Sequence, residues 1–218
     1  RSGTTLLESI VADPEYVQSG GELGSFKNLI QFEITTFSKG NVEQIQLYLN
    51  HYIEKMKFIM GDKKFLVDKL PFNIFLIGFI RKYLPAAKIL IINREPWDNA
   101  KSIYKELYID AHFYSTKFFN IAMQISNFTF AKNYWQKILE SEDNIFELDY
   151  QNLVDSPVQI SKKIYEFLGI KHELDLENRK KFYSNTSSFS QVKKDITATS
   201  KKYETFSEFK EQFQIDLK

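Results

Sequence analysis

The chain has 218 residues, of which 43% are hydrophobic and 26% charged, so its composition excludes wholesale disorder and its length suits one domain over residues 1–218. Its 29 basic and 28 acidic residues leave a net charge of +1, so no overall field attracts nucleic acid or an acidic membrane, and any anion site must be local. There is no cysteine, which excludes disulfides and thiolate zinc sites, and the three histidines are far apart; we therefore expect no metal.

The longest apolar run covers residues 74–80, which is too short to span a bilayer, and no signal peptide is visible. From these features we expect a cytoplasmic protein without a membrane segment. The sequence begins at Arg1 rather than at a methionine, so we expect further sequence upstream. That upstream region leaves room for another domain, a targeting segment or an anchor.

The hydrophobic pattern predicts an alternation of helices and short strands. In chain order it predicts a helix over 4–12, a loop at 19–21, helices over 26–36 and 42–60, a strand over 64–68, a helix over 71–83, a strand over 88–93, a helix over 97–108, a long or broken helix over 114–140, a strand over 144–149, and helices over 154–168 and 204–213. Strands separated by helices imply parallel crossovers. We therefore expect an α/β fold with three layers, in which helices flank both faces of a P-loop-like parallel sheet.

Ligands on such sheets bind beyond the carboxyl ends of the strands. The polar exceptions in this chain fall at those ends: the opening segment 1–5, Asp68-Lys69, Asn93-Arg94 and Asp149-Tyr150. We expect these residues to gather around a ligand.

The opening segment Arg1-Ser2-Gly3-Thr4-Thr5 leads straight into the first apolar helix. A glycine lets backbone approach a ligand closely, and the N–H groups and hydroxyls at the positive end of a helix dipole suit a phosphate or sulfate group. The alternative is an ordinary Ser/Thr helix cap. No Gly-Lys-Ser/Thr follows, which argues against an ATP- or GTP-dependent kinase and against magnesium held by this loop.

Arg94 directly follows the strand that is predicted most clearly, and Ser102 lies eight positions later, inside the next predicted helix. The chain has only four arginines, and two of them, Arg1 and Arg94, fall at predicted strand ends, where a guanidinium can bind phosphate through two hydrogen bonds. The alternative for Arg94 is an ion pair with Glu95 or Asp98.

Taken together, these segments resemble the sulfotransferase family. Arg1-Ser2-Gly3-Thr4-Thr5-Leu6 is similar to the family's 5′-phosphosulfate loop, and Arg94 with Ser102 is similar to its 3′-phosphate motif. In detail the chain resembles the tyrosylprotein sulfotransferases and the bacterial sulfotransferase domains that are often joined to tetratricopeptide repeats. Those proteins carry Asp-Lys-x-Pro-x-Asn, here at 68–73, then Tyr-Glu-x-Leu-Val, here at 150–154, and Thr-Ala-Ser-x-x-Gln-Val-Arg, here at 186–193. The ordered matches cover nearly the whole chain.

The chain also departs from the family pattern. The proline after Gln-Val-Arg is Asp195 here, and the closing Ser-x-x-Arg-Trp matches the segment at 200–203 only if one residue is dropped. The family's first strand comes just before the Arg-Ser-Gly loop, so we expect that strand to precede Arg1, along with an upstream repeat domain.

The resemblance implies a donor, 3′-phosphoadenosine 5′-phosphosulfate (PAPS), its product 3′-phosphoadenosine 5′-phosphate (PAP), and an acceptor hydroxyl on a protein tyrosine, a sugar or a small alcohol. It implies Glu22 as general base, because the tyrosyl enzymes place a catalytic Glu 21 residues past the motif Arg. The alternative for Glu22 is a solvated loop carboxylate. Lys69, at the end of a predicted strand, is expected to stabilise the leaving oxygen; its alternative is a surface lysine.

The resemblance assigns further contacts. Arg1 and Ser188 are expected to add charge stabilisation during transfer. Cofactor contacts are expected from Arg1, Ser2, Gly3, Thr4, Thr5, Leu6, Arg94, Ser102, Tyr150, Gln191, Ser200, Lys201 and Lys202. The alternative for Tyr150 is an aromatic at the sheet edge. His112 lies on no matching loop, so we expect a structural role for it.

Two other function classes remain open on the residues alone. One is a nucleotide or phosphosugar kinase of related fold, against which the absence of Gly-Lys-Ser/Thr argues. The other is a binding domain that keeps the nucleotide cleft without turnover, against which the presence of both Glu22 and Lys69 argues.

Overall fold

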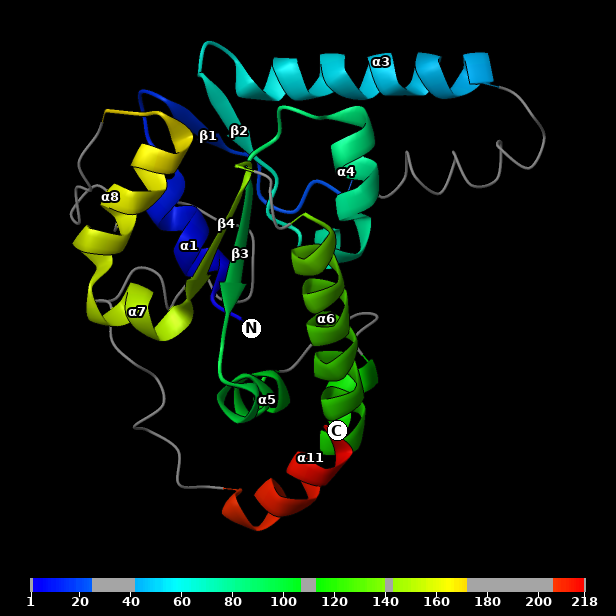
Figure 1. Cartoon of the computed structure of the whole chain (residues 1–218), viewed down its shortest axis with the longest axis vertical. Helices are drawn as coiled ribbons and strands as arrows, with labels where there is room; N and C mark the ends of the chain where they lie inside the picture. The colour runs from blue at the N-terminus through cyan, green and yellow to red at the C-terminus, as the bar shows by residue number, and fades with distance from the viewer. Residues whose placement is uncertain (1, 25–41, 107–112, 140–142, 172–205, 218) are drawn as a thin grey trace.

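A computed structural model describes residues 2–24, 42–106, 113–139, 143–171 and 206–217 (Figure 1). The helices of these residues are α1 (Thr4–Val11), α3 (Val42–Met60), α4 (Ile77–Tyr83), α5 (Pro96–Tyr104), α6 (Phe118–Ile138), α7 (Tyr150–Asp155), α8 (Pro157–Leu168) and α11 (Lys210–Asp216). The strands are β1 (Val17–Ser19), β2 (Phe65–Val67), β3 (Ile89–Asn93) and β4 (Ile145–Asp149), and the 3₁₀ helices are η1 (Pro71–Leu76), η2 (Phe113–Thr116) and η4 (Ser207–Phe209).

The strands form two parallel pairs. β1 pairs with β2 from Val17↔Phe65 to Ser19↔Val67, and β3 pairs with β4 from Ile89↔Ile145 to Asn93↔Asp149. The parallel direction confirms the crossover argument, and the result is a mixed α/β fold with short parallel strands. One continuous sheet was expected, but among the described residues no strand pairing joins the two pairs. Apolar patterning indicates which strands are buried, whereas it does not determine which backbone groups they bond to.

A shared core, rather than a shared hydrogen-bond ladder, joins the two strand pairs. α1, α7 and α8 supply most of the buried side chains: Leu7, Ile10, Val11, Leu153, Ile164, Tyr165 and Leu168. Phe65 and Val67 of β2 and Leu90 and Ile92 of β3 pack against this same cluster. The Tyr165 hydroxyl donates to the Ile10 carbonyl at 2.7 Å, which fixes α8 against α1.

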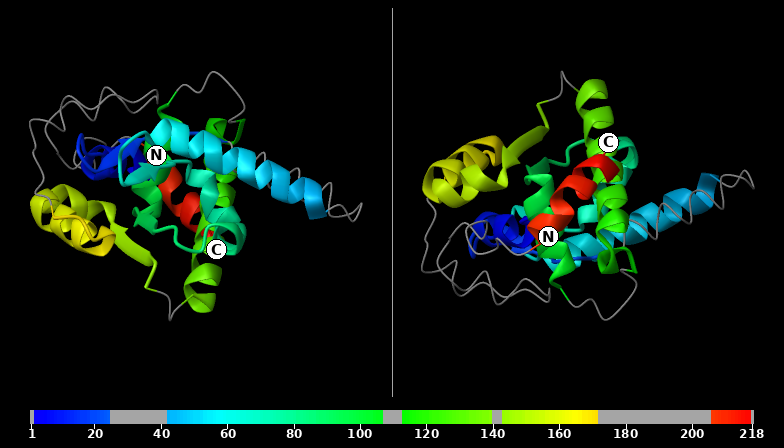
Figure 2. Two further views of the ribbon diagram at one scale, coloured as in Figure 1. Left: turned by 90° about the horizontal axis from the view of Figure 1, so that it is seen from above. Right: turned by 90° about the horizontal axis from the view of Figure 1, so that it is seen from below.

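The helices lie on both sides of the strands. In Figure 1, α1, α7 and α8 lie to one side of β3 and β4, and α4 and α6 lie to the other. α5, α6 and α11 share a second buried cluster that includes Trp97, Ile121 and Phe213. α3 packs with η1 and α4 through Leu49 and Tyr52. Figure 2 shows the N-terminal end of α3 projecting past the rest of the molecule. None of the helices that the structure describes has the length and hydropathy needed to cross a membrane.

Several expected boundaries were wrong in informative ways. The helix over 71–83 is split into η1 and α4, and the expected helix over 154–168 begins only at Pro157, after the separate short helix α7. A proline at the first position of α8 explains this break, because proline has no backbone N–H to continue the preceding helix. No strand was expected where β1 lies, and its last residue, Ser19, was expected in the loop at 19–21. The helix expected over 97–108 ends at Tyr104. The helix expected over 26–36 lies outside the described residues.

Candidate active site

The opening segment folds as the start of a helix. Gly3 is the N-cap of α1, with a φ of 104° that L side chains rarely adopt, and Thr5 in the first turn is buried. The Ser/Thr cap that served as the alternative interpretation is therefore wrong, because the capping residue has no side chain. A helix N-terminus that begins on glycine leaves its backbone accessible to an anion.

Gly3 also packs against the start of α7. A Cβ atom added to Gly3 would lie 2.4 Å from Cδ2 of Tyr150 and 3.3 Å from Cδ1 of Ile92, and the first of these distances is closer than real side chains approach. This close packing brings the N-terminus of α1 against β3 and against the residue that follows β4. Tyr150, predicted from its motif, therefore lies at the opening segment.

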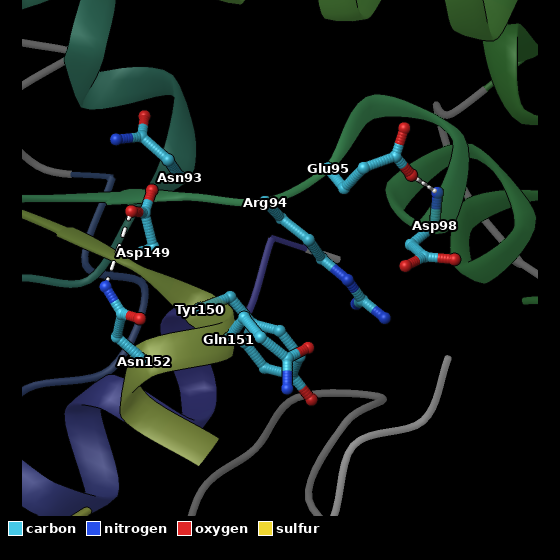
Figure 3. A pocket seen from close by; sticks show the side chains of 8 residues that line it. All are labelled: Asn93, Arg94, Glu95, Asp98, Asp149, Tyr150, Gln151 and Asn152. Atoms are coloured by element: carbon cyan, nitrogen blue, oxygen red, sulfur yellow. Dashed lines mark hydrogen bonds between the residues drawn. The ribbon is translucent and has the colours of Figure 1, made fainter. Parts of the chain in front are cut away.

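Arg94 reaches toward the same tyrosine. Its guanidinium carbon lies 4.5 Å from the centroid of the Tyr150 ring, a cation–π distance (Figure 3). The two acids named as its alternative partners have other bonds: Glu95 accepts the backbone N–H of Asp98 at 2.7 Å, and Asp98 pairs with Lys101 at 2.7 Å. Ser102 lies half-buried on α5, the helix that follows Arg94.

A pocket of about 400 Å³ lies at the carboxyl ends of β3 and β4. It is lined by Asn93, Arg94, Glu95, Asp98, Asp149, Tyr150, Gln151 and Asn152 (Figure 3). Asn93-Arg94 and Asp149-Tyr150, two of the four polar segments expected to gather, therefore meet here, whereas Asp68-Lys69 does not line this pocket. Gln151 and Asn152 were not expected to line a site, although their place directly after a strand end could have indicated it.

The second group of polar residues lies at the ends of β1 and β2. The Lys69 ammonium donates to Oε1 of Glu22 at 2.6 Å, although the two residues are 47 positions apart in the chain. Lys69 is only 7% exposed, so the surface-lysine alternative is wrong. The Glu22 side chain is 45% exposed, so this carboxylate is open to solvent on one side while it bonds a buried cation on the other.

A third residue of this group, Glu8 of α1, was missed by the sequence reasoning. It is 1% exposed, and its Oε1 accepts hydrogen bonds from the Ser19 hydroxyl at 2.6 Å and from the Gly21 backbone N–H at 3.1 Å. Its Oε2 lies 3.9 Å from Nζ of Lys69. Burial raises the pKa of Glu8, and the Ser19 hydrogen bond, the Lys69 charge and the Gly21 N–H each counteract part of that rise. The sequence alone carried no specific signal for this residue, because a glutamate on a helix is ordinarily exposed.

Lys69 and the preceding Asp68 are bonded to the loop that carries Glu22. The Lys69 backbone N–H donates to the Gly21 carbonyl at 2.8 Å. Burial raises the pKa of Asp68, while hydrogen bonds from the Leu23 backbone and the Asn73 side chain lower it in part. These bonds tie the end of β2 to the loop that carries Glu22.

The remaining candidates lie outside the described residues: Arg1, Ser188, Gln191, Ser200, Lys201 and Lys202, and also His112. Their roles stay predictions.

Comparison with known proteins places the chain in a family. The family described as Sulfotransferase family matches residues 1–174. An uncharacterized protein of Aquifex aeolicus (strain VF5) is 28% identical over 223 aligned residues, which cover 92% of this chain and 28% of that protein. The chain therefore spans little more than a quarter of the length of this relative. Since the family match covers most of its residues, the chain belongs to the sulfotransferase family, an enzyme family that uses PAPS.

Proposed function

We propose that this chain transfers the sulfuryl group of PAPS to a hydroxyl acceptor by in-line displacement, with Glu22 as general base and Lys69 at the leaving oxygen. The observation that carries the proposal is the 2.6 Å contact between Lys69 and Glu22. Two segments far apart in sequence bring a cation and a carboxylate together beside α1, the helix that begins at the anion loop.

The described residues fit a donor that carries two anionic groups. The N-terminus of α1, with Ser2, Gly3, Thr4, Thr5 and Leu6, offers backbone and hydroxyl groups for the 5′-phosphosulfate. Arg94 and Ser102 follow the β3 strand and offer a guanidinium and a hydroxyl for the 3′-phosphate. When bound, PAPS supplies the activated sulfuryl group and a phosphate leaving group. Arg1, Gln191, Ser200, Lys201 and Lys202 are further proposed contacts.

Glu22 suits the role of base better than the other carboxylate beside Lys69. Its side chain is 45% exposed, so an acceptor hydroxyl can approach it, whereas Glu8 is buried and accepts two hydrogen bonds. To take the acceptor's proton, a carboxylate oxygen of Glu22 must face that hydroxyl. The proton is then held on the Glu22 carboxyl group.

Lys69 suits the leaving-group role because it is a buried cation at a strand end. In a water-poor site a fixed ammonium stabilises developing negative charge more strongly than in bulk water. Ser188 and Arg1 are proposed to assist it. The acceptor remains a protein tyrosine, a sugar or a small alcohol, since the cofactor and transfer residues are common to all three.

Sulfate transfer from labelled PAPS to a panel of tyrosine peptides, sugars and alcohols tests this proposal. In Glu22→Gln, turnover on the best acceptor is expected to fall by about 10²–10⁴-fold, the usual contribution of a general base, while PAP binding stays unchanged. Glu54→Gln is the matched control, because Glu54 forms an exposed ion pair with Lys57 on α3. Near-normal turnover of Glu22→Gln on a true acceptor would show that the base lies elsewhere.

A further inference from the structure

Glu8 is a buried carboxylate for which the proposed chemistry has no role. It lies within α1 and is 1% exposed, although a glutamate is among the side chains least often buried. A charge in such a place is tolerated only where hydrogen bonds and an opposite charge compensate for the lost water. The groups that compensate for Glu8 therefore indicate what it does.

The groups that compensate for the buried charge of Glu8 all lie beside the proposed base, Glu22, and the proposed leaving-group cation, Lys69. Oε1 accepts from Ser19, the last residue of β1, and from the Gly21 N–H on the loop that leads to Glu22. Oε2 has no hydrogen-bond partner among the described residues and lies 3.9 Å from the Lys69 ammonium. One carboxylate thus contacts both the loop of the proposed base and the proposed leaving-group cation.

Lys69 lies between two carboxylates that differ in exposure. Glu22 bonds it at 2.6 Å and is partly exposed, whereas Glu8 lies at 3.9 Å and is enclosed. When Glu22 takes the acceptor's proton it becomes a neutral carboxyl group, so Lys69 loses the negative charge of this partner. A buried ammonium left without any counter-ion would be strongly disfavoured. Glu8 is placed to remain beside Lys69 throughout that proton transfer.

We propose that Glu8 is a positioning residue: it serves as the permanent counter-ion of Lys69 and anchors the loop that carries Glu22. Through Glu8, helix α1, whose N-terminus is proposed to bind the donor, also fixes Lys69 and Glu22, the two groups proposed to act on the reacting atoms. This inference rests on the proposed function, because it assigns Glu8 a role through Lys69 and Glu22.

The first test needs neither donor nor acceptor. Urea unfolding of the wild type, Glu8→Gln, Lys69→Met and the double variant gives the coupling between the two residues. If Glu8 is the counter-ion, Glu8→Gln lowers the folding equilibrium constant more in the wild-type background than in the Lys69→Met background, where the neighbouring side chain is neutral. The two losses are expected to differ by about 2- to 150-fold. Additive effects of the two substitutions would overturn the counter-ion role.

The second test measures turnover at saturating PAPS in the same four proteins, with PAP binding measured alongside. Glu8→Gln is expected to lower turnover by up to about 10²-fold, the scale for a misplaced catalytic group, and to leave PAP affinity unchanged. The amide introduced by Glu8→Gln keeps a side-chain oxygen that can accept the Ser19 and Gly21 hydrogen bonds, so the substitution removes only the charge beside Lys69. In the Lys69→Met background Glu8→Gln is therefore expected to cost nothing further. The surface control Glu54→Gln keeps both values.

Wild-type turnover in Glu8→Gln, or an equal loss in both backgrounds, would overturn the positioning role alone. Normal transfer by both Glu22→Gln and Lys69→Met would instead overturn the proposed function, and the positioning role with it. The two failures are therefore distinguishable in one set of proteins.

Discussion

The N-terminus and the interior of α1 face two different environments. At the N-terminus, Gly3 meets the ring of Tyr150, and Arg94 lies over that ring beside an open polar pocket. Farther along the helix, Glu8 is enclosed and linked to Lys69 and to the loop of Glu22. We call the first region the donor region (Gly3, Arg94, Ser102, Tyr150) and the second the transfer region (Glu8, Ser19, Glu22, Lys69).

The difference follows from what each region has to do. A donor region must open to a large anion, so it relies on backbone, a guanidinium and an aromatic face that are reachable from the pocket. A transfer region must hold its charges in place before the reaction, so that little reorganisation is needed when charge develops. Its cation is accordingly buried, at 7% exposure, and fixed by hydrogen bonds to the loop that carries Glu22.

The largest effect on stability is expected from Gly3→Ala in the donor region. The new Cβ would lie 2.4 Å from the Tyr150 ring on a backbone with φ of 104°, so the free energy of unfolding should fall by about 2–4 kcal/mol. Gly61→Ala is the matched control, because Gly61 also has positive φ but nothing within 4 Å of the added atom; it should cost only about 1–2 kcal/mol. Urea unfolding measures both. Equal losses would contradict the close packing, and a Tyr150→Ala background should remove the excess.

A smaller effect, on ligand affinity, is expected from Arg94→Ala. If Arg94 binds the 3′-phosphate, PAP affinity should fall by about 1.5–3 kcal/mol, the value of a charge-assisted hydrogen bond. Adenosine 5′-phosphosulfate lacks the 3′ group and should lose far less. Calorimetric titration of both ligands measures the difference, and Ser102→Ala should show the same selectivity at about 0.5–1.5 kcal/mol. Equal losses for the two ligands would mean that Arg94 does not bind the 3′-phosphate.

The smallest effect expected is a pH dependence that arises in the transfer region. Burial raises the pKa of Glu8 in the folded protein, so the folded state binds this proton more tightly than the unfolded chain does. The stability contributed by Glu8 is therefore fully present below its unfolded pKa and is lost as pH rises through its folded pKa. Lowering the pH from about 7 to about 5 should stabilise the wild type relative to Glu8→Gln, as urea unfolding at both values would show. The opposite trend would contradict the buried position of Glu8.

Much of the fold could be predicted from local pattern. The segments around β2, β3 and β4 are short and largely apolar, and the helices between them imply their parallel direction. β1 could not be predicted in this way, because Val17-Gln18-Ser19 has only one apolar residue. That strand depends on its pairing with β2, which is a tertiary contact.

The candidate site also contains residues that could be predicted from local sequence and one that depends on tertiary contacts. Lys69 and Glu22 could be proposed from motif and spacing, and the structure brings them to 2.6 Å. Glu8 could not, because a glutamate on a helix is ordinarily read as solvent-exposed. Its burial depends on Ser19, Gly21 and Lys69, which reach it from other segments of the chain.

The separation of donor and transfer regions is tested most directly by one paired measurement: the PAP dissociation constant and the single-turnover rate at saturating PAPS, in Glu22→Gln and in Arg94→Ala. We expect Glu22→Gln to keep the dissociation constant and to lose about 10²–10⁴-fold in rate. We expect Arg94→Ala to lose affinity and to keep most of its rate once the donor is saturating. Parallel losses of affinity and rate in both variants, or an unchanged rate in Glu22→Gln, would contradict the account.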